Sequence, residues 1–163
     1  MFRWSLSRHS TRTSSVVSSP TASPLPGTRR VQSEARYNQL TDGTWDDQSY
    51  TVQSAQVNSA PALTSDGNLL HLAWRDDNDD HITRAYSTGG PWLGHQRLDD
   101  RASSARPALA AINISDLVMV WKGVDGDSSM WWSRMRNNVW SPQQPFTDPE
   151  HQLHAADGRV AMF

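Results

Sequence analysis

The sequence contains no cysteine, a single lysine and only two glutamates among its 163 residues. Without cysteine the chain forms neither a disulfide framework nor a thiolate zinc site. No apolar run approaches the roughly 18 residues that a membrane-spanning helix needs, so the sequence predicts no membrane span. The two glutamates, Glu34 and Glu150, lie near the ends of the region discussed below. They do not form the pair of carboxylates that glycoside hydrolysis commonly requires.

The formal net charge of −2 hides a difference between the N-terminal segment and the rest of the chain. Residues 1–30 hold five arginines and no acidic residue, so this segment carries +5, and −2 less +5 leaves −7 for the remainder. An acidic folded region argues against a nucleic-acid partner. Because the segment is rich in Ser, Thr and Pro with little apolar spacing, we expect residues 1–33 to be a disordered leader. Its composition also suits an organelle transit peptide, and a plain flexible leader is the alternative.

Tryptophan is abundant by contrast, with eight residues, and several of them recur at a nearly constant spacing. Landmark residues repeat at offsets of 46, 47 and 48 positions, in the pairs Pro61 and Pro107, Trp74 and Trp121, and Trp92 and Trp140. A near-constant offset between landmarks indicates an internal repeat.

Each repeat unit has the pattern of several short strands separated by turns. In the first complete unit, Asp66-Gly67 predicts a type I′ hairpin turn between strands near 60–64 and 68–74. A third strand is expected over 81–87, and a fourth from Trp92 to about Leu98. The second unit has its turns near Ser115-Asp116, over 123–128 and at Asn137-Asn138. Four strands in about 47 residues match the size of one β-propeller blade.

The sequence therefore predicts an all-β chain that forms an incomplete β-propeller. We expect the end of one blade over 34–58, whole blades over 59–104 and 105–148, and the start of a truncated blade over 149–163. The last of these is inferred because Asp157–Phe163 matches Asp66–Leu72. Two whole and two half blades do not close a ring that typically has four to eight members. We therefore expect a fragment of a larger propeller, or a protomer that completes its ring with other copies of itself.

The motifs SAPAL, LHLAW and ITRAYS of the first unit, and ARPALA and LVMVWKGVDGDSSMWWS of the second, resemble the repeats of bacterial and fungal β-propeller lectins. This group includes fucose-binding and sialidase-like propellers, and the similarity covers about residues 35–163. Thr41-Asp42-Gly43-Thr44-Trp45 is similar to the Asp-box turn of sialidase-like propellers, without the spacer between Asp and Gly. The resemblance implies a carbohydrate or glycoprotein partner and sugar pockets between neighbouring blades.

Sugar recognition needs an aromatic ring for the apolar face of a pyranose and fixed polar groups for its hydroxyls. The candidate sugar-binding residues are Trp131, Trp132, Lys122, Trp121, Tyr86, Arg84 and Arg75. Trp131 and Trp132 depart from the repeat, because the first unit has Thr83 and Arg84 in their places. Packing between blades is the alternative role for these tryptophans, and above all for the repeated Trp121.

No cofactor or metal site is predicted. Asp76, Asn78 and Asp80 are spaced like the start of an EF-hand loop, but the glycine and the bidentate glutamate of that motif are missing. Asp125-Gly126-Asp127 and the pair His151 and His154 likewise lack further ligands. No catalytic constellation stands out, so an enzyme is not expected. The alternatives to a lectin are a sialidase-like glycoside hydrolase fragment and a protein-interaction propeller that binds no sugar.

Overall fold

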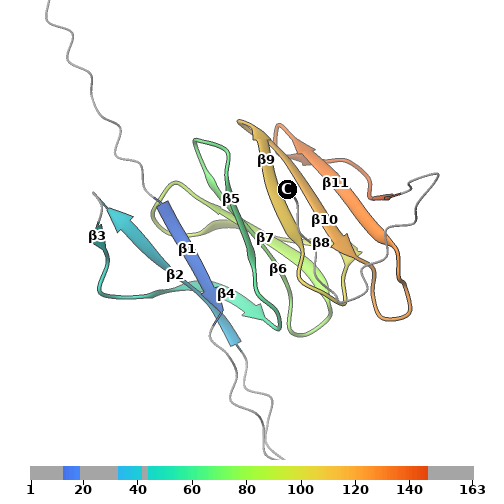
Figure 1. Ribbon diagram of the computed structural model, residues 1–163, viewed down its shortest axis with the longest axis horizontal. Helices are drawn as coiled ribbons and strands as arrows, with labels where there is room; N and C mark the ends of the chain where they lie inside the picture. The colour runs from blue at the N-terminus through green and yellow to red at the C-terminus, as the bar shows by residue number, and fades with distance from the viewer. Residues whose placement is uncertain (1–12, 19–32, 42–43, 147–163) are drawn as a thin grey trace, which may run out of the picture.

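The computed structural model describes residues 13–18, 33–41 and 44–146 (Figure 1). Every regular element in this part of the chain is a β-strand, and all strand pairs are antiparallel. The all-β prediction is therefore confirmed for the described residues. They include no helix long and apolar enough to cross a membrane.

The first sheet, called sheet 1, is built around one central strand. It consists of β1 (Thr13–Ser18), β2 (Ser33–Thr41), β3 (Thr44–Trp45) and β4 (Tyr50–Val57). β2 pairs with β1 along one edge and with β3 and β4 along the other. β1, a strand of 6 residues, is the part of the predicted leader that the structure describes before Ser33.

The remaining strands form two further sheets with the same strand order. Sheet 2 consists of β5 (Ala62–Ser65), β6 (Leu70–Arg75), β7 (His81–Ser87) and β8 (Leu93–Ala102) in that spatial order. Sheet 3 consists of β9 (Ala108–Asn113), β10 (Asp116–Lys122), β11 (Met130–Arg136), β12 (Val139–Trp140) and β13 (Gln144–Pro145). β12 and β13 both pair with β11, so together they occupy the place that β8 has in sheet 2.

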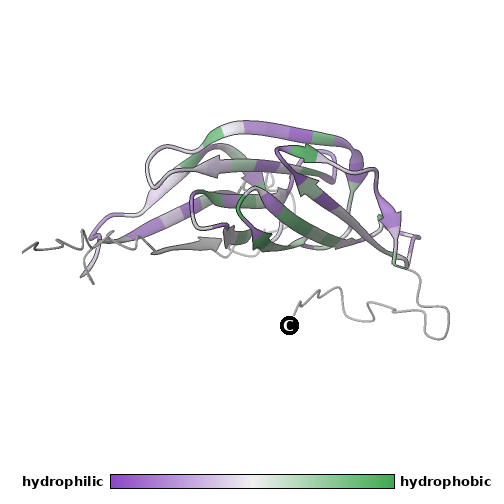
Figure 2. Cartoon of the chain, turned by 90° about the horizontal axis from the view of Figure 1, so that it is seen from above, coloured by the Kyte–Doolittle hydropathy of each residue, from purple (hydrophilic) through white to green (hydrophobic). Residues whose placement is uncertain are grey.

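The three sheets lie side by side in chain order (Figure 1), and their facing surfaces are packed on each other. One buried cluster joins sheets 1 and 2, with members Ala35, Val52, Val57, Leu72, Trp74, Ala85 and Trp92 among others. A second cluster joins sheets 2 and 3 through Ala73, Ile82, Leu98, Met119 and Trp121. In the view from above (Figure 2), the long strand at the top is mostly hydrophilic, and hydrophobic segments lie on the strands below it.

Sheet 2 is buried on both faces because it lies between the other two. On β6, Leu72 and Trp74 belong to the cluster with sheet 1, whereas Ala73 between them belongs to the cluster with sheet 3. Side chains of a strand alternate between its two faces. The consecutive apolar residues Leu72, Ala73 and Trp74 therefore pack into two different cores, which explains why this part of β6 lacks polar alternation.

Two predicted turns differ in geometry. Asn137 and Asn138 both have positive φ, at 49° and 68°, as a type I′ turn requires. At Asp66-Gly67 only Gly67 has positive φ, at 93°, so the type I′ prediction is wrong there. The Asp66 carboxylate instead accepts hydrogen bonds from the backbone N–H groups of Asn68 and Leu69 and holds a wider turn.

The repeated tryptophans differ in burial according to which neighbour they have. Trp74 and Trp121 are 0% and 1% exposed, each in a core between two sheets. Trp92 packs on sheet 1 and Trp140 packs on sheet 2, so both are shielded. Trp45 occupies the same place of the repeat in sheet 1 and is 45% exposed. No sheet covers Trp45 within the described residues.

Four predicted features fall outside the described residues. They are the leader residues 1–12 and 19–32, the Asp42-Gly43 turn, the pair His151 and His154, and the partial repeat over 149–163.

Candidate functional site

A groove of about 630 Å³ runs between the outer strand of sheet 2 and the β11–β12 turn of sheet 3. We call it the β8–β12 groove. Its lining comes from β8 with Gln96, Arg97, Leu98, Asp99, Asp100 and Arg101, and from the turn and its continuation with Asn138, Val139, Trp140, Ser141 and Pro142. The groove thus combines one indole ring with amide, guanidinium and carboxylate groups.

Arg101 and Trp140 form the floor on which the two sides of the groove meet. The Arg101 guanidinium lies 5.7 Å from the centre of the Trp140 ring, within range of a cation–π contact. Arg101 also donates to Ser133 Oγ at 3.1 Å and to the Ser141 carbonyl at 2.6 Å. Its side chain is only 5% exposed, and Asp100 is its ionic partner. These contacts fix the floor, while the carboxylates of Asp99 and Asp100 remain open to solvent.

Arg84 lies directly behind the groove wall and is 7% exposed. Its Nε donates to Gln96 Oε1 at 2.9 Å and its Nη2 donates to Asn138 Oδ1 at 3.2 Å. Its Nη1 is 3.3 Å from Met135 Sδ. Burial lowers the pKa of Arg84 from its ordinary value, and nearby Tyr86 opposes this effect. One contact to β8 and two contacts to sheet 3 therefore hold this cation without a carboxylate.

A second groove, of about 590 Å³, lies on the other side of the β12 segment. Its lining residues are Trp132, Arg134, Arg136, Val139, Trp140, Ser141, Pro142 and Gln144. Trp132 points to the face of sheet 3 opposite Trp131, since the two are consecutive on β11. Arg134 is held by Asp116 through Nε at 2.7 Å and Nη2 at 2.5 Å. Trp132 is the one predicted sugar-binding residue that lines either of these two grooves.

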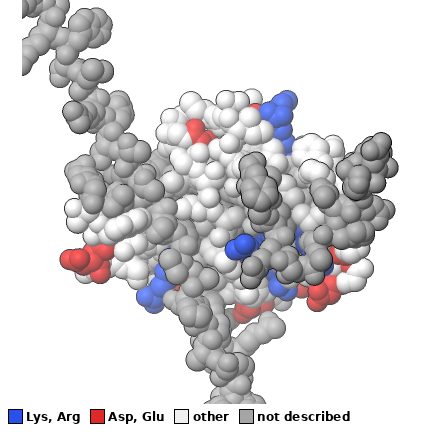
Figure 3. All heavy atoms as spheres, in the orientation of Figure 1, with Lys and Arg blue, Asp and Glu red and all other residues white. Residues whose placement is uncertain are grey.

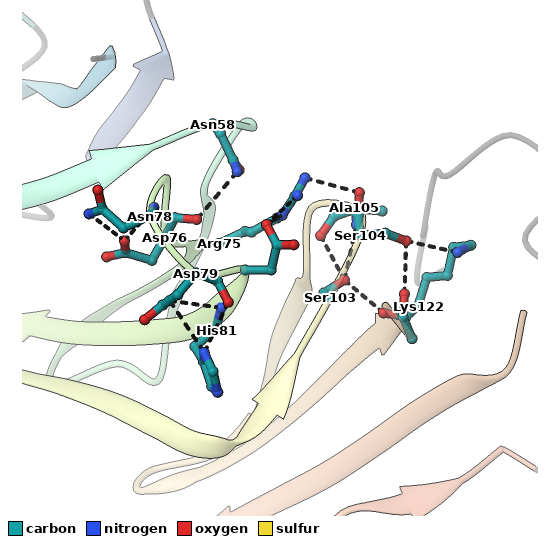
Figure 4. Close-up of polar contacts among 12 residues, drawn as sticks. Asn58, Arg75, Asp76, Asn78, Asp79, His81, Ser103, Ser104, Ala105 and Lys122 are labelled. Atoms are coloured by element: carbon teal, nitrogen blue, oxygen red, sulfur yellow. Dashed lines mark hydrogen bonds and ion pairs between the residues drawn. The ribbon is translucent and has the colours of Figure 1, made fainter. Parts of the chain in front are cut away.

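Two of the predicted residues, Arg75 and Lys122, meet elsewhere at Ser104 (Figure 4), and Lys122 also contacts the Asp127 backbone, whose carboxylate accepts from Trp131. Arg75 donates to the Ser104 carbonyl at 3.1 Å and pairs with Asp80. Lys122 Nζ donates to Ser104 Oγ at 2.8 Å and to the Asp127 carbonyl at 3.3 Å. Trp131 Nε1 donates to Asp127 Oδ2 at 2.8 Å. The cluster ties the loop after β8 to the β10–β11 loop, so we assign it a structural role.

The pKa of Asp127 reflects this bonding. Hydrogen bonds from the Ser129 N–H and from the Trp131 indole lower the pKa of this carboxyl, as the positive charge of Lys122 does to a lesser degree. Asp127 is therefore an anion that organises its own loop.

The last two predicted residues also pack against the protein. Trp121 is 1% exposed in the cluster between sheets 2 and 3, so its ring packs against protein in this structure. The Tyr86 ring lies against Gly94: a methyl group added there would be 2.2 Å from Tyr86 Cε1. Gly94 also has a φ of 61°, so glycine is required twice over at this contact.

Charges at the surface are mostly balanced in pairs. Arg97 contacts Asp79 and Asp99, and Arg136 lies near Asp116. On the face shown in Figure 3, acidic and basic side chains are scattered around the margin, and neither sign forms a continuous patch among the described residues. Among these residues, no three histidine or carboxylate side chains gather as metal ligands.

Comparison with the models of known protein families gave no match, and a search of curated proteins gave none either. The geometry of the grooves therefore carries the functional argument alone.

Sequence reasoning missed most of the β8–β12 groove. Gln96, Asp99, Asp100 and Asn138 were not singled out, and Trp140 was read as part of the repeat skeleton. One signal was present in the sequence. Tyr37, Arg84 and Trp132 each stand eight residues ahead of a repeated tryptophan, at 37 and 45, 84 and 92, and 132 and 140. Arg84 is the charged residue at a position that is aromatic in the other two sheets, and this difference indicates the β8–β12 groove.

Proposed function

We propose that this chain is a carbohydrate-binding, lectin-like β-propeller module and that the β8–β12 groove holds the sugar. The observation that carries the proposal is the combination of one indole ring, two amides and several charged groups in a single groove between two sheets. A pyranose offers an apolar face and a ring of hydroxyls, so it suits a wall with one aromatic ring and many hydrogen-bonding groups.

The polar groups of the groove are suited to hydroxyl recognition. Asp99 and Asp100 are exposed acceptors, with side chains 84% and 58% exposed, and ionised carboxylates make strong hydrogen bonds to hydroxyl donors. Asn138 stands at a turn whose left-handed backbone fixes the direction of its amide. Such pre-positioned groups cost little conformational entropy when a ligand binds.

A pair of neighbouring substitutions tests the proposal. Asn138→Gly retains the left-handed turn but removes the amide from the groove, whereas Asn137→Gly makes the same change at a residue that does not line it. We expect the wild-type chain to bind members of a glycan array and Asn138→Gly to bind them about tenfold more weakly. Asn137→Gly should bind like the wild type. Absence of glycan binding by the wild type, or equal binding by both variants, would contradict the proposal.

We further propose that the three sheets are blades of an incomplete propeller and that other sheets of the same kind cover its open faces. What supports this is Trp45, which is 45% exposed although its counterparts Trp92 and Trp140 are shielded by a neighbouring sheet. Val139 and Trp132 lie at the opposite end of the stack, and Val139 is 71% exposed. A second copy of the chain would supply such a sheet, and the mass of the protein in solution tests this.

A further inference from the structure

The charge of Arg84 is the feature that the structure balances least. Three other arginines are buried or half-buried in the described part of the chain, and each has an aspartate partner: Arg75 with Asp80, Arg101 with Asp100 and Arg134 with Asp116. Arg84 is 7% exposed, and no carboxylate of the described residues lies within ion-pair distance of it. A buried charge without a counterion is strongly unfavourable in a protein.

The fold does not require a cation at this position. Tyr37 occupies the equivalent place in sheet 1 and Trp132 the equivalent place in sheet 3, and both side chains are neutral. The Tyr37 ring packs edge-on against Trp92, with 5.9 Å between centroids, so an aromatic side chain fills this location between sheets 1 and 2. Departures from a local rule without an evident structural gain occur mainly at functional sites.

The hydrogen bonds of Arg84 all go to neutral acceptors. The Nε and Nη2 groups form the side-on edge of the guanidinium, which binds a carboxylate through two parallel hydrogen bonds. Here that edge donates to two separate amide oxygens, those of Gln96 and Asn138. Both residues are exposed and both line the β8–β12 groove. An amide oxygen is a weaker acceptor for a guanidinium than an anionic oxygen, so a bound anion would displace these two side chains favourably.

We infer that the β8–β12 groove takes an anionic saccharide, a sugar that carries a carboxylate or a sulfate group, and that Arg84 is the counterion of that group. This inference rests on the proposed sugar-binding function and narrows it to acidic ligands. Arg97 and Arg101 also line the groove, but their charges are balanced by Asp79, Asp99 and Asp100. The preference for an acidic sugar therefore comes from Arg84.

Matched acidic and neutral probes test the inference. We would measure the affinity of the full chain by calorimetry for glucuronic acid against glucose, and for galactose 6-sulfate against galactose. The wild type should bind at least one acidic probe about 10- to 100-fold more tightly than its neutral counterpart, the range expected for a charge-assisted hydrogen-bonded pair. The pair that shows the preference distinguishes a carboxylate from a sulfate ligand.

Two variants assign the preference to Arg84. Arg84→Gln removes the charge, and Arg84→Tyr installs the residue type that sheet 1 uses at this place; in both variants the ratio of acidic to neutral affinity should fall to about one. Arg36→Gln, an equal charge change at an exposed residue of sheet 1, should keep it. Neutral and acidic probes bound equally by the wild type would refute the acidic ligand and leave the proposed function standing. Failure of every sugar to bind would refute both, and a preference that survives in both Arg84 variants would refute the role of Arg84.

Discussion

Asp66 offers the sharpest test of how sheets 2 and 3 are held together. Its carboxylate side chain is 0% exposed. Oδ1 accepts hydrogen bonds from the N–H groups of Asn68 and Leu69 at 2.9 and 2.7 Å. Oδ2 accepts from the Ser115 N–H at 3.0 Å and from His71 Nε2 at 3.1 Å. Because Ser115 belongs to the β9–β10 turn, one side chain joins a hairpin of sheet 2 to sheet 3.

The pKa of Asp66 gives the size of this contribution. Burial alone raises the pKa of the carboxyl, but the hydrogen bonds from Leu69, Ser115, His71 and Asn68 outweigh burial and lower it from 3.8 to about 2. A carboxyl whose pKa is lower in the folded state stabilises the protein above its unfolded-state pKa and loses this contribution as pH falls through the folded-state pKa. The shift is equivalent to about 2 kcal/mol near neutral pH, of which about half remains at pH 3.

We expect Asp66→Asn to lower the free energy of unfolding by about 3 kcal/mol at pH 7. The amide retains one oxygen for the turn but places its own N–H donors against those of Ser115 or His71. Urea unfolding of wild type and variant, followed by tryptophan fluorescence at several values between pH 3 and 7, measures the difference. It should be about 1 kcal/mol smaller at pH 3 than at pH 7, because the Asp66 carboxyl is then largely protonated in the unfolded chain but still mostly ionised in the folded protein.

The control for this experiment is Asp125→Asn, at an exposed residue of the β10–β11 loop. This variant should unfold like the wild type at every pH. If the Asp66→Asn difference is the same at pH 3 and pH 7, the charge of Asp66 does not stabilise the fold and the reasoning from its hydrogen bonds is wrong.

Two further predictions concern the stack of sheets. Trp74→Ala should lower the free energy of unfolding by about 3 to 5 kcal/mol, because the ring is fully buried. Trp45→Ala should lower it by less than about 1 kcal/mol in the monomer, because that ring is 45% exposed. Equal losses in urea titrations would contradict the assigned cores. Light scattering coupled to size exclusion should give a mass that is a multiple of 18.3 kDa, and Trp45→Asp should shift it towards a single copy; a wild-type monomer at high concentration would refute assembly through copies of the chain.

The strand pattern was readable from the sequence because it depends on local information. The four strands expected within 59–104 match β5 to β8, and the paired positive φ angles of Asn137 and Asn138 match the expected turn. Alternation and turn residues act over a few positions, so one sequence suffices to reveal them. The same reasoning failed at Asp66, where a side chain rather than the backbone sets the turn. It also gave no sign of β1, because that strand is defined by its pairing with β2 and not by a local pattern.

The candidate site was less accessible to sequence reasoning because its contacts join distant residues. Arg84 meets Met135 and Asn138 across more than fifty positions, and no local pattern encodes that distance. Trp131 was predicted to face a ligand from its departure from the repeat. Its indole N–H donates to Asp127, a residue four positions away that the sequence suggested only as a possible metal ligand.

The position shared by Tyr37, Arg84 and Trp132 connects the repeat to the proposed function. The repeat places this side chain on the sheet face that meets the following sheet, and the residue type then decides the chemistry of that junction. Tyr37 packs on Trp92, and Arg84 reaches the amide groups of the β8–β12 groove. Trp132 lines the second groove, beside the paired charges of Arg134 and Asp116. Two junctions and the open face of sheet 3 therefore differ in polarity at one position of the repeat, and the proposed acidic ligand would bind at the junction of sheets 2 and 3, which holds Arg84.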